Sequence, residues 1–271
     1  FANNYGTPPG QSELVCGQIL KELPRDEVIV SSKAGYRMWP GPYGDGLSKK
    51  YIVASCDQSL QRLGLEYLDI FYLHRPDYET PLEESLGALD LLIRQGKVLY
   101  GGVSNFPGAH FAEAVRICQR EGFAPITIHQ PSYSMINRRI EWDLLPQTER
   151  AGTGVIVFSP LAGGLLSGKY LDGTIPADSR AALSWGEENA RSRLTPERLA
   201  TLNALDDIAR RRGQTLSQLA LAWALRLPGL TSVLIGASRV GQIEENVGAL
   251  ANMSFSAEEL AEIDALSPAR P

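Results

Sequence analysis

Three residues whose side chains exchange protons stand at the ends of short apolar runs or near the start of the chain. Lys33 ends a run that begins at Val28, His74 ends a run that begins at Leu68, and Tyr5 lies close to the first residue. The ordinary pKa of a phenol is about 10, and a neighbouring ammonium lowers it because it favours the phenolate. A histidine can donate a second hydrogen bond to the reacting oxygen. Together these side chains would protonate a carbonyl oxygen, with Tyr5 as donor, Lys33 lowering its pKa and His74 orienting the carbonyl.

Each of these residues also has an ordinary structural alternative. A tyrosine in a loop is commonly a surface or packing residue, and a lysine at a strand end is commonly solvated. Histidine is the more informative type because the chain has only 3. We expect His110 to be exposed at the start of a helix and His129 to pack beneath the strand ends. His74 is then the histidine that could act on a substrate.

The elements that would position these residues alternate along the chain. Short β-branched or aromatic runs are separated by segments with the period of a helix, which predicts repeated strand–helix units. Most of the runs are apolar on both faces, as a parallel sheet covered on both sides requires. The predicted strands are residues 28–32, 68–74, 98–104, 126–130, 155–159 and 232–236, and the predicted helices are residues 12–23, 48–63, 81–95, 109–121, 142–151, 196–212, 216–227 and 239–250.

Residues that favour helix ends support several of these boundaries. Thr80 and Pro81 are suited to begin the third predicted helix, with the threonine as its cap. Ser256 and Glu259 form a capping box before a further short helix. Gly122 stands where the fourth helix should stop.

Repeated units with no linker rich in Pro, Gly or Ser favour one α/β domain over residues 1–271, either a (β/α)8 barrel or an open doubly wound sheet. Two observations favour the barrel. Residues that could do chemistry cluster just after the strands, as expected when these loops face one shared mouth. No Gly-x-Gly-x-x-Gly motif stands between an early strand and a helix. The barrel would lack its first two strands, which we expect before Phe1, and residues 161–194 would form a binding loop or lid.

Composition and charge exclude several classes of protein. The 271 residues are 44% hydrophobic and 21% charged, and no apolar run approaches the roughly 20 residues that cross a bilayer. A formal net charge of −5 gives no general attraction to nucleic acid or to an anionic membrane. Cys16, Cys56 and Cys118 lie far apart in predicted helices, which favours a reducing cytoplasm over a disulfide framework or a metal cluster. We therefore expect no metal, no nucleic-acid partner and no membrane partner.

Several segments resemble the aldo-keto reductases, a family of (β/α)8 barrels that reduce carbonyl groups with NADPH. Residues 2–6 (Ala-Asn-Asn-Tyr-Gly) are similar to the segment around the family's catalytic tyrosine. Residues 32–35 (Ser-Lys-Ala-Gly) are similar to the segment around its lysine, and residues 69–75 to that around its histidine. The similarity follows the family's order along the whole chain, and the segments similar to its cofactor contacts are residues 103–106, 129–133, 158–170 and 236–246.

The resemblance implies a role for individual residues. It makes Tyr5, Lys33 and His74 catalytic, and it places the family's catalytic aspartate immediately before Phe1, outside this chain. Trp39, in a loop rich in Pro and Gly, is expected near the substrate. The residues implied to bind NADP are Ser104, Asn105, Gln130, Phe158, Ser159, Pro160, Leu161, Ala162, Gly163, Lys169, Arg180, Gly236, Ser238, Arg239, Gln242, Glu245 and Asn246.

Physical arguments support these implied contacts with a dinucleotide. Backbone N–H groups of the glycine-bearing loop after Ser159 can approach a pyrophosphate closely, and Lys169 adds positive charge. A helix that starts near Arg239 presents free N–H groups to an anion, and the arginine could bind a 2′-phosphate. No acidic residue lies between Gly236 and Gly241 to favour a free 2′-hydroxyl, so NADP is expected rather than NAD. Without the resemblance, the polar residues of 242–246 would be taken as a solvated helix face.

Within the family, residues 35–44 and 233–239 are most similar to the bacterial L-glyceraldehyde 3-phosphate reductases, which are themselves similar to potassium channel β subunits. This likeness implies small aldehydes as substrates, including glyceraldehyde 3-phosphate and methylglyoxal, and a chain able to form a homo-oligomer. Two alternatives stay open. The protein could be an NADPH-sensing regulatory subunit with slow turnover, or a catalytically silent relative without the aspartate.

Overall fold

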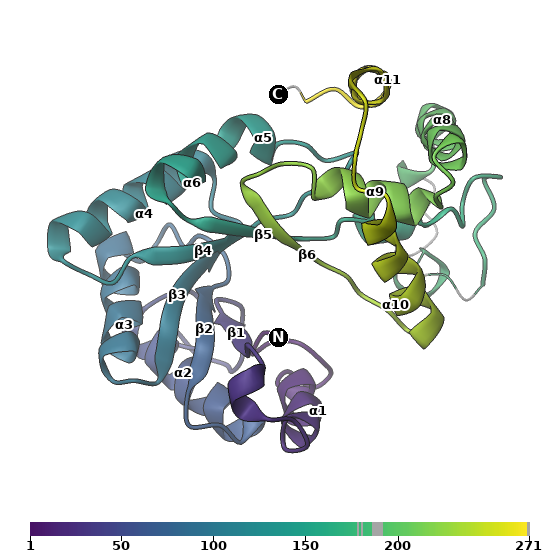
Figure 1. Ribbon diagram of the computed structural model, residues 1–271. Helices are drawn as coiled ribbons and strands as arrows, with labels where there is room; N and C mark the ends of the chain where they lie inside the picture. Colours follow the sequence, from purple (N-terminus) through teal and green to yellow (C-terminus); the bar gives the residue numbers. More distant parts are fainter. Residues whose placement is uncertain (178, 180, 186–191, 270–271) are drawn as a thin grey trace. The chain divides into compact units, whose positions relative to one another are not determined.

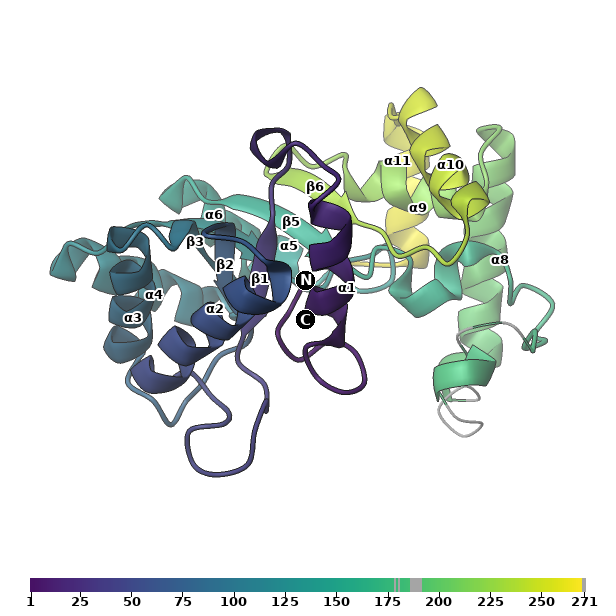
Figure 2. The same cartoon turned by 90° about the horizontal axis from the view of Figure 1, so that it is seen from below.

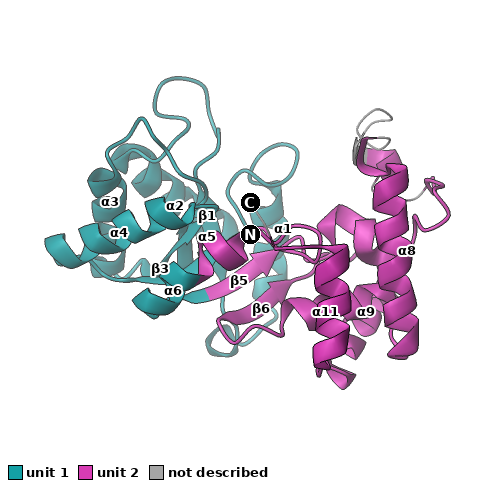
Figure 3. Cartoon of the chain, turned by 90° about the horizontal axis from the view of Figure 1, so that it is seen from above, with its two compact units in different colours: residues 1–130, 146–154 teal, residues 131–145, 155–271 magenta. Residues whose placement is uncertain are grey.

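The computed structural model describes residues 1–177, 179, 181–185 and 192–269, and Figure 1 shows the course of the chain. The chain divides into two compact units, which Figure 3 draws in different colours. Unit 1 comprises residues 1–130 and 146–154, and unit 2 comprises residues 131–145 and 155–271. Each unit is therefore built from two separate stretches of sequence.

Unit 1 is a parallel sheet with helices packed beside it (Figures 1 and 2). Each strand pairs with the next one along the chain, and α2, α3 and α4 pack against one another in succession. Its strands are β1 (Ser31–Ala34), β2 (Leu68–Leu73), β3 (Val98–Ser104) and β4 (Ile126–Gln130). Its helices are α1 (Gln11–Leu20), the short η1 (Arg25–Glu27), α2 (Lys49–Leu63), α3 (Leu82–Arg94) and α4 (Gly108–Glu121), and most of α6 (Leu145–Ala151) also belongs to it.

The core of unit 1 lies between the sheet and these helices. Phe71 on β2, Val103 on β3 and Phe111 on α4 are fully buried, which is the main source of stability for strands with two covered faces. The Tyr72 side chain on β2 packs closely against Gly102 on the neighbouring strand β3. A Cβ atom at Gly102 would lie 2.6 Å from a ring carbon of Tyr72. A side chain at that position would displace Tyr72 from the core.

Unit 2 combines a pair of parallel strands with a cluster of helices (Figure 1). Trp223 and Tyr133 are fully buried in its core and stack with ring centroids 5.4 Å apart. The strands are β5 (Gly154–Phe158) and β6 (Leu230–Leu234). The helices are α5 (Ile140–Asp143), η2 (Ala162–Ser167), η3 (Ala181–Trp185), α8 (Pro196–Arg211), α9 (Leu216–Ala224), α10 (Val240–Val247), η4 (Gly248–Ala251) and α11 (Ala257–Leu266).

A network of ion pairs centred on the buried Arg138 joins distant elements of unit 2. Glu141 on α5 accepts from Arg138 at 2.8 Å and from Arg226 at 3.1 Å, and it also accepts a hydrogen bond from the Tyr133 hydroxyl. Arg138 pairs in addition with Asp264 on α11 at 2.5 Å. The network therefore links α5 to the end of α9 and to the last helix.

The sequence-based prediction of the fold class is confirmed. Within the described residues, every predicted strand is present, the paired strands are parallel, and helices alternate with them, as in part of a (β/α)8 barrel. The bounds of β1 differ from the prediction, because the backbone N–H of Val30 donates to the Asp69 side chain at 2.8 Å. The ladder therefore starts at Ser31, and Ile29 is 79% exposed.

Proline and local hydrogen bonds explain the other differences. The predicted helix 142–151 is two helices, α5 and α6, that meet before Pro146, which cannot donate to the preceding turn. The Thr80 hydroxyl donates to Asp77 at 2.8 Å and so does not cap α3. The capping box of Ser256 and Glu259 is confirmed, as is the end of α4 at Gly122. The stretch 161–194, predicted without helix, contains the short turns η2 and η3.

The cysteines are all in the first unit and all free. Cys56 and Cys118 are buried, and burial raises the pKa of their thiols to about 12 and about 11. Cys16 on α1 is half-buried. Among the helices of the described ranges, none combines the length and low polarity that a bilayer crossing requires.

Candidate active site and cofactor cradle

The three residues predicted to transfer a proton lie together in unit 1. Parallel pairing aligns the ends of β1 and β2, and the His74 N–H extends the ladder by donating to the Ala34 carbonyl at 2.9 Å. Lys33 and His74 therefore reach the same edge of the sheet. The Tyr5 ring centroid lies 5.7 Å from the Lys33 Nζ atom and 5.7 Å from the His74 ring centroid, which it meets edge to face.

Exposure divides this cluster into a reachable group and two supporting groups. Tyr5 is 45% exposed, whereas Lys33 and His74 are 5% and 6% exposed. A ligand can therefore meet the phenol directly, while the amine and the imidazole act from a largely desolvated position. The Lys33 Nζ atom donates to the Phe1 carbonyl at 2.8 Å, and the His74 Nδ1 atom is buried without a hydrogen-bond partner among the described residues.

The electrostatics differ from the sequence-based expectation at Tyr5. Burial raises the pKa of the Tyr5 phenol, and Tyr36 raises it further. Burial lowers the pKa of Lys33 to about 8. Burial, followed by the charge of Lys33, lowers the pKa of His74 to about 3. Tyr5 therefore keeps its proton at neutral pH, and His74 is uncharged. The Tyr5 pKa is raised, whereas the sequence analysis expected it to be lowered.

Two residues that the sequence analysis did not assign complete the surroundings of His74. The Tyr36 ring meets His74 edge to face at 4.7 Å between centroids, and it is 40% exposed. Gly35 has a φ of 154°, and a Cβ there would lie 3.1 Å from the His74 Cβ. Tyr36 lies three positions after Lys33, and the pairing of β1 with β2 brings it beside the histidine.

Trp39 belongs to a loop with a fixed shape in unit 1. The Met38 N–H donates to the Gly44 carbonyl at 2.8 Å, and a Cβ at Gly44 would lie 1.9 Å from the Trp39 carbonyl oxygen. The indole packs at 5.2 Å from the Tyr51 ring, and the Tyr51 hydroxyl donates to the Tyr36 carbonyl. Trp39 is therefore connected to the surroundings of His74 through Tyr51 and Tyr36.

Three of the residues that the resemblance implies as cofactor contacts form one hydrogen-bonded group at the ends of β3 and β4. They are Ser104, Asn105 and Gln130. The Ser104 hydroxyl donates to the Gln130 carbonyl at 2.7 Å, and the Asn105 backbone N–H donates to the same oxygen at 3.3 Å. The Asn105 side-chain amide donates to Ser104 at 3.1 Å and to the His74 carbonyl at 3.3 Å. Asn105 has a φ of 59°, a conformation that asparagine tolerates better than most residues. The group is thus built onto the proton-transfer cluster.

His129 and His110 complete the set of histidines. His129 is fully buried, as expected, and its Nε2 atom bonds to the Phe106 carbonyl at 3.1 Å. The expectation of an exposed His110 is wrong, because its ring is half-buried between Phe106 and Tyr78, with centroids 4.8 and 5.3 Å away.

Unit 2 contains a cavity of about 550 Å³ at the ends of β5 and β6, which we call the cradle. Most of the predicted dinucleotide contacts of this unit line it, from the loop after β5 and from the start of α10. They are Ser159, Pro160, Leu161, Gly163, Lys169, Gly236, Ser238, Arg239, Gln242, Glu245 and Asn246. Phe158 and Ala162 do not line the cradle, since Ala162 lines a neighbouring cavity. Arg180 lies outside the described residues.

The loop after β5 exposes its backbone through residues with left-handed conformations. Ser159, Ala162, Gly163 and Gly164 have φ values of 57°, 50°, 72° and 108°. Successive turns of this kind direct N–H groups into a concave surface that suits an anion. Lys169 adds a positive charge to the same cavity.

The start of α10 forms the other wall of the cradle. The Ser238 backbone N–H and hydroxyl both bond to the Gln242 side-chain oxygen, at 2.8 and 3.2 Å. Glu245 accepts a hydrogen bond from the Thr215 hydroxyl at 2.9 Å, so its carboxylate holds α10 to α9. Among the described residues that line the cradle, Glu245 is the one carboxylate, against Lys169 and Arg239. The charged side chains of this lining therefore carry a net positive charge.

Sequence reasoning did not single out several of the residues that line the cradle. Gly164, Ser167, Tyr170 and Ala237 lie inside the segments 158–170 and 236–246, where neighbouring residues were named instead. Leu183, Ser217, Leu234 and Ile235 lie outside both segments. Ser217 lies on α9 and has no local signal, because only the packing of α9 on α10 brings it there.

Comparisons with known proteins show the family to which the chain belongs. Residues 1–268 match the aldo/keto reductase family. The chain is 51% identical over 273 residues to L-glyceraldehyde 3-phosphate reductase of Escherichia coli (strain K12), covering 97% of this chain and 78% of that protein. It is 39% identical over 246 residues to a probable voltage-gated potassium channel subunit beta of Arabidopsis thaliana, covering 89% of this chain and 74% of that protein. A probable subunit of the same name from Oryza sativa subsp. japonica is 37% identical over 268 residues, which cover 97% of this chain and 81% of that protein.

The chain therefore belongs to the aldo/keto reductase family and is an oxidoreductase. Enzymes of this family use nicotinamide cofactors.

Proposed function

We propose that this protein is an NADPH-dependent reductase of small aldehydes, with Tyr5 as the general acid and with glyceraldehyde 3-phosphate and methylglyoxal among its substrates. The observation that carries the proposal is the cluster in unit 1, where a protonated, exposed phenol adjoins a buried amine and an uncharged imidazole. The likeness to L-glyceraldehyde 3-phosphate reductase supports the substrate class.

The bound cofactor would supply a hydride to the carbonyl carbon, and residues of unit 1 would supply the proton to the carbonyl oxygen. The Tyr5 hydroxyl donates its proton to the carbonyl oxygen, so that the products are an alcohol and a phenolate on Tyr5. At a pH below the Lys33 pKa of about 8, Lys33 is an ammonium ion, and its positive charge stabilises the Tyr5 phenolate. His74, kept neutral by a pKa of about 3, donates a hydrogen bond to the same oxygen from a ring N–H group. Trp39 limits the space near this oxygen in the proposed substrate complex.

Cofactor binding is assigned to two groups of residues. Ser104, Asn105 and Gln130 would hold the carboxamide and so orient the nicotinamide ring. The loop after β5 with Lys169 would hold the pyrophosphate, and Ser238, Arg239 and Gln242 at the start of α10 would hold the adenosine and its 2′-phosphate. Among the described residues that line the cradle, Lys169 and Arg239 outnumber the one carboxylate, Glu245, which accepts a hydrogen bond from Thr215.

The proposal treats residues 1–271 as one catalytic domain that acts on a diffusible substrate in the cytoplasm. The three free cysteines suit a reducing compartment. The likeness to the family also supports a homo-oligomer.

A second candidate function is an NADPH-sensing regulatory subunit. The likeness to the probable potassium channel subunits over most of this chain favours it. Both functions need the cradle, but only the reductase needs rapid proton donation from Tyr5.

Fluorescence titration with NADPH and NADH, followed by aldehyde in the same cuvette, distinguishes the two. We expect NADPH to bind more tightly than NADH, and its fluorescence to fall promptly when glyceraldehyde 3-phosphate or methylglyoxal is added. Binding with no oxidation over many minutes would favour the sensing subunit. Absence of NADPH binding would contradict both functions.

A further inference from the structure

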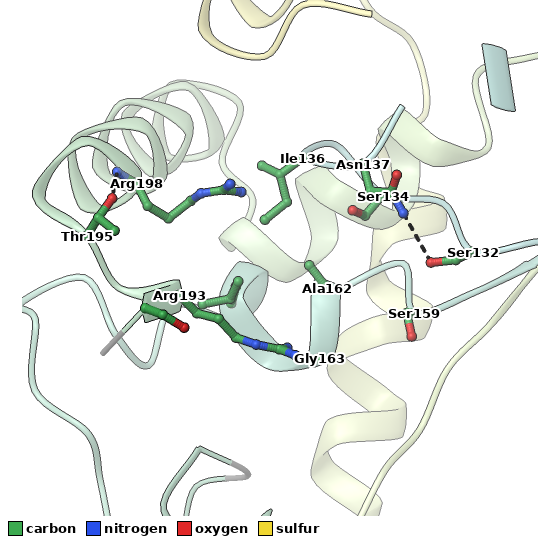
Figure 4. A pocket seen from close by; sticks show the side chains of 12 residues that line it. Ser132, Ser134, Ile136, Asn137, Ser159, Ala162, Gly163, Arg193, Thr195 and Arg198 are labelled. Atoms are coloured by element: carbon green, nitrogen blue, oxygen red, sulfur yellow. Dashed lines mark hydrogen bonds between the residues drawn. The ribbon is translucent and has the colours of Figure 1, made fainter. Parts of the chain in front are cut away.

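A second cavity of unit 2, of about 570 Å³, adjoins the cradle and is not used by the proposed function. We call it the arginine cavity. It lies between the loop after β4 and the start of α8, and it shares Ser159 and Gly163 with the cradle. Figure 4 shows its lining, with the side chains of Arg193 and Arg198 extending from the same wall into the cavity.

The lining is rich in groups that bind phosphate. Besides the two arginines, it contains the hydroxyls of Ser132, Ser134, Ser159, Ser192 and Thr195 and the amide of Asn137. No carboxylate is found among the described residues that line it. Arginine presents a planar fork of N–H donors that matches the oxygens of a phosphate, and hydroxyls complete such sites.

Arg198 differs from other arginines of α8 in having no ion-pair partner among the described residues. Arg210 and Arg211 on α8 pair with Asp206 and Glu262, each at 2.5 Å. Across the described part of the chain, no carboxylate pairs with Arg198. Its backbone N–H donates to Thr195, which caps the helix, so the guanidinium projects from a fixed first turn.

Ser134 supplies an independent observation that points to a ligand. Its side chain is 1% exposed, it lines the arginine cavity, and its hydroxyl has no hydrogen-bond partner among the described residues. The backbone of Ser134 is fixed by two hydrogen bonds with Asn137, at 3.2 and 3.0 Å. A buried hydroxyl without a partner is costly, and an oxygen-rich ligand in the cavity would satisfy it.

We infer that the arginine cavity binds the phosphate group of a small phosphate monoester, with Arg198 and Ser134 as its principal contacts. The shared residues Ser159 and Gly163 place this phosphate beside the cradle, so that it binds together with the dinucleotide. The phosphate monoester can be the substrate itself or a separate ligand that acts on the cradle. The first source rests on the proposed function, whereas the site does not.

The first test is binding of inorganic phosphate to the full chain saturated with NADPH, measured by calorimetry at constant ionic strength. We expect saturable binding at one site, and Arg198→Met should weaken it by about tenfold or more. Arg210→Met removes the same charge from the same helix and should leave phosphate binding unchanged. Ser134→Ala should weaken phosphate binding to a smaller extent without changing the NADPH affinity.

Kinetics with a matched pair of aldehydes identifies the source of the phosphate. If Arg198→Met raises KM for glyceraldehyde 3-phosphate but not for glyceraldehyde, the substrate supplies the phosphate. If the variant loses phosphate binding with both KM values unchanged, the site serves a separate phosphate monoester. Both outcomes support a phosphate site.

Three outcomes would overturn the inference: no saturable phosphate binding, equal binding by the wild type and Arg198→Met, or displacement of NADPH by phosphate. The last would make the cavity part of the cradle. Calorimetry needs no turnover, so a failure of the reductase proposal would leave this test intact.

Discussion

The two units prepare their candidate sites in opposite ways. In unit 1 the supporting groups Lys33 and His74 are almost fully buried, and only Tyr5 is open to a ligand. In unit 2 the cradle is lined by exposed backbone turns and by charged side chains at the surface, such as Arg239. Burial moves pKa values and suits proton transfer, whereas exposed donors keep their ordinary charge and suit the binding of phosphates. The contrast predicts that substitutions in the two clusters will impair different properties: turnover for the buried cluster of unit 1 and cofactor binding for the cradle of unit 2.

The largest expected effect is on turnover, at the one exposed member of the buried cluster. Tyr5→Phe removes the proton donor and should lower kcat by about 10²- to 10⁴-fold. The NADPH dissociation constant should stay nearly unchanged, because Tyr5 does not line the cradle and is not among the residues assigned to the cofactor. Tyr43→Phe, at an exposed tyrosine of the same unit, is the matched control and should have wild-type kinetics. Loss of cofactor binding in Tyr5→Phe would break the comparison and point to a structural role.

Breaking the ion network of unit 2 should lower the free energy of unfolding by an amount comparable to the loss in activation free energy at Tyr5. Glu141→Ala leaves Arg138 and Arg226 without their shared carboxylate and should cost about 3–5 kcal/mol. Amide exchange should accelerate in α9 and α11 more than in β2 and β3. Glu262→Ala, which breaks the exposed pair with Arg211, should cost no more than about 1 kcal/mol. Equal acceleration of amide exchange in both units would contradict a stabilising effect of Glu141 that is confined to unit 2.

Mild acid should destabilise unit 1 before unit 2, because the histidines are all in unit 1. Burial lowers the folded pKa of both His74 and His129 to about 3, below the unfolded value of about 6.5. The unfolded state then binds more protons, so stability is lost as the pH falls from about 6.5, by about 1.4 kcal/mol per pH unit for each histidine.

In unit 2 the first groups to titrate are carboxylates. Burial alone would raise the pKa of Glu141, but the hydrogen bonds from Arg138 and Tyr133 and the Arg226 charge lower it. Amide protection measured at pH 7 and pH 5 should therefore fall in β2 and β4 before it falls in α9. His129→Gln should reduce the pH dependence of unit 1. A uniform loss across both units would argue against histidine titration.

The smallest expected effect is at the start of α10. Arg239→Ala removes one exposed contact to a 2′-phosphate and should weaken NADPH binding by about tenfold, with NADH binding unchanged. Titration of both cofactors by fluorescence measures the difference. The control is Arg210→Ala on α8, which does not line the cradle. An equal effect on NADPH and NADH would remove the argument for a phosphate contact at this residue.

The sequence was most informative where local pattern and tertiary structure agree. Runs such as residues 70–73 and 155–158 are apolar on both faces, and they are strands because a covered parallel sheet is the structure that buries both faces. The capping box at Ser256 and the glycine at Gly122 act within a few residues, so their effects were also predictable.

Features that depend on distant contacts could not be predicted in the same way. The direction of the Tyr5 pKa shift follows from the burial of the cluster and from Tyr36, neither of which the sequence specifies. Ser217 reaches the cradle only through helix packing. Arg198 stands in an unremarkable helical segment, and its significance arises from the loop after β4 that faces it.

The distribution of cysteines makes the protein suited to site-specific labelling. The raised pKa values of Cys56 and Cys118 leave little reactive thiolate at neutral pH, and both side chains are shielded. A maleimide dye should therefore modify Cys16 on α1 selectively without prior mutagenesis. Since unit 2 has no cysteine, one engineered cysteine on an exposed position of α8 would complete a donor–acceptor pair. Energy transfer in single molecules would then follow the separation of the two units as cofactor and substrate bind.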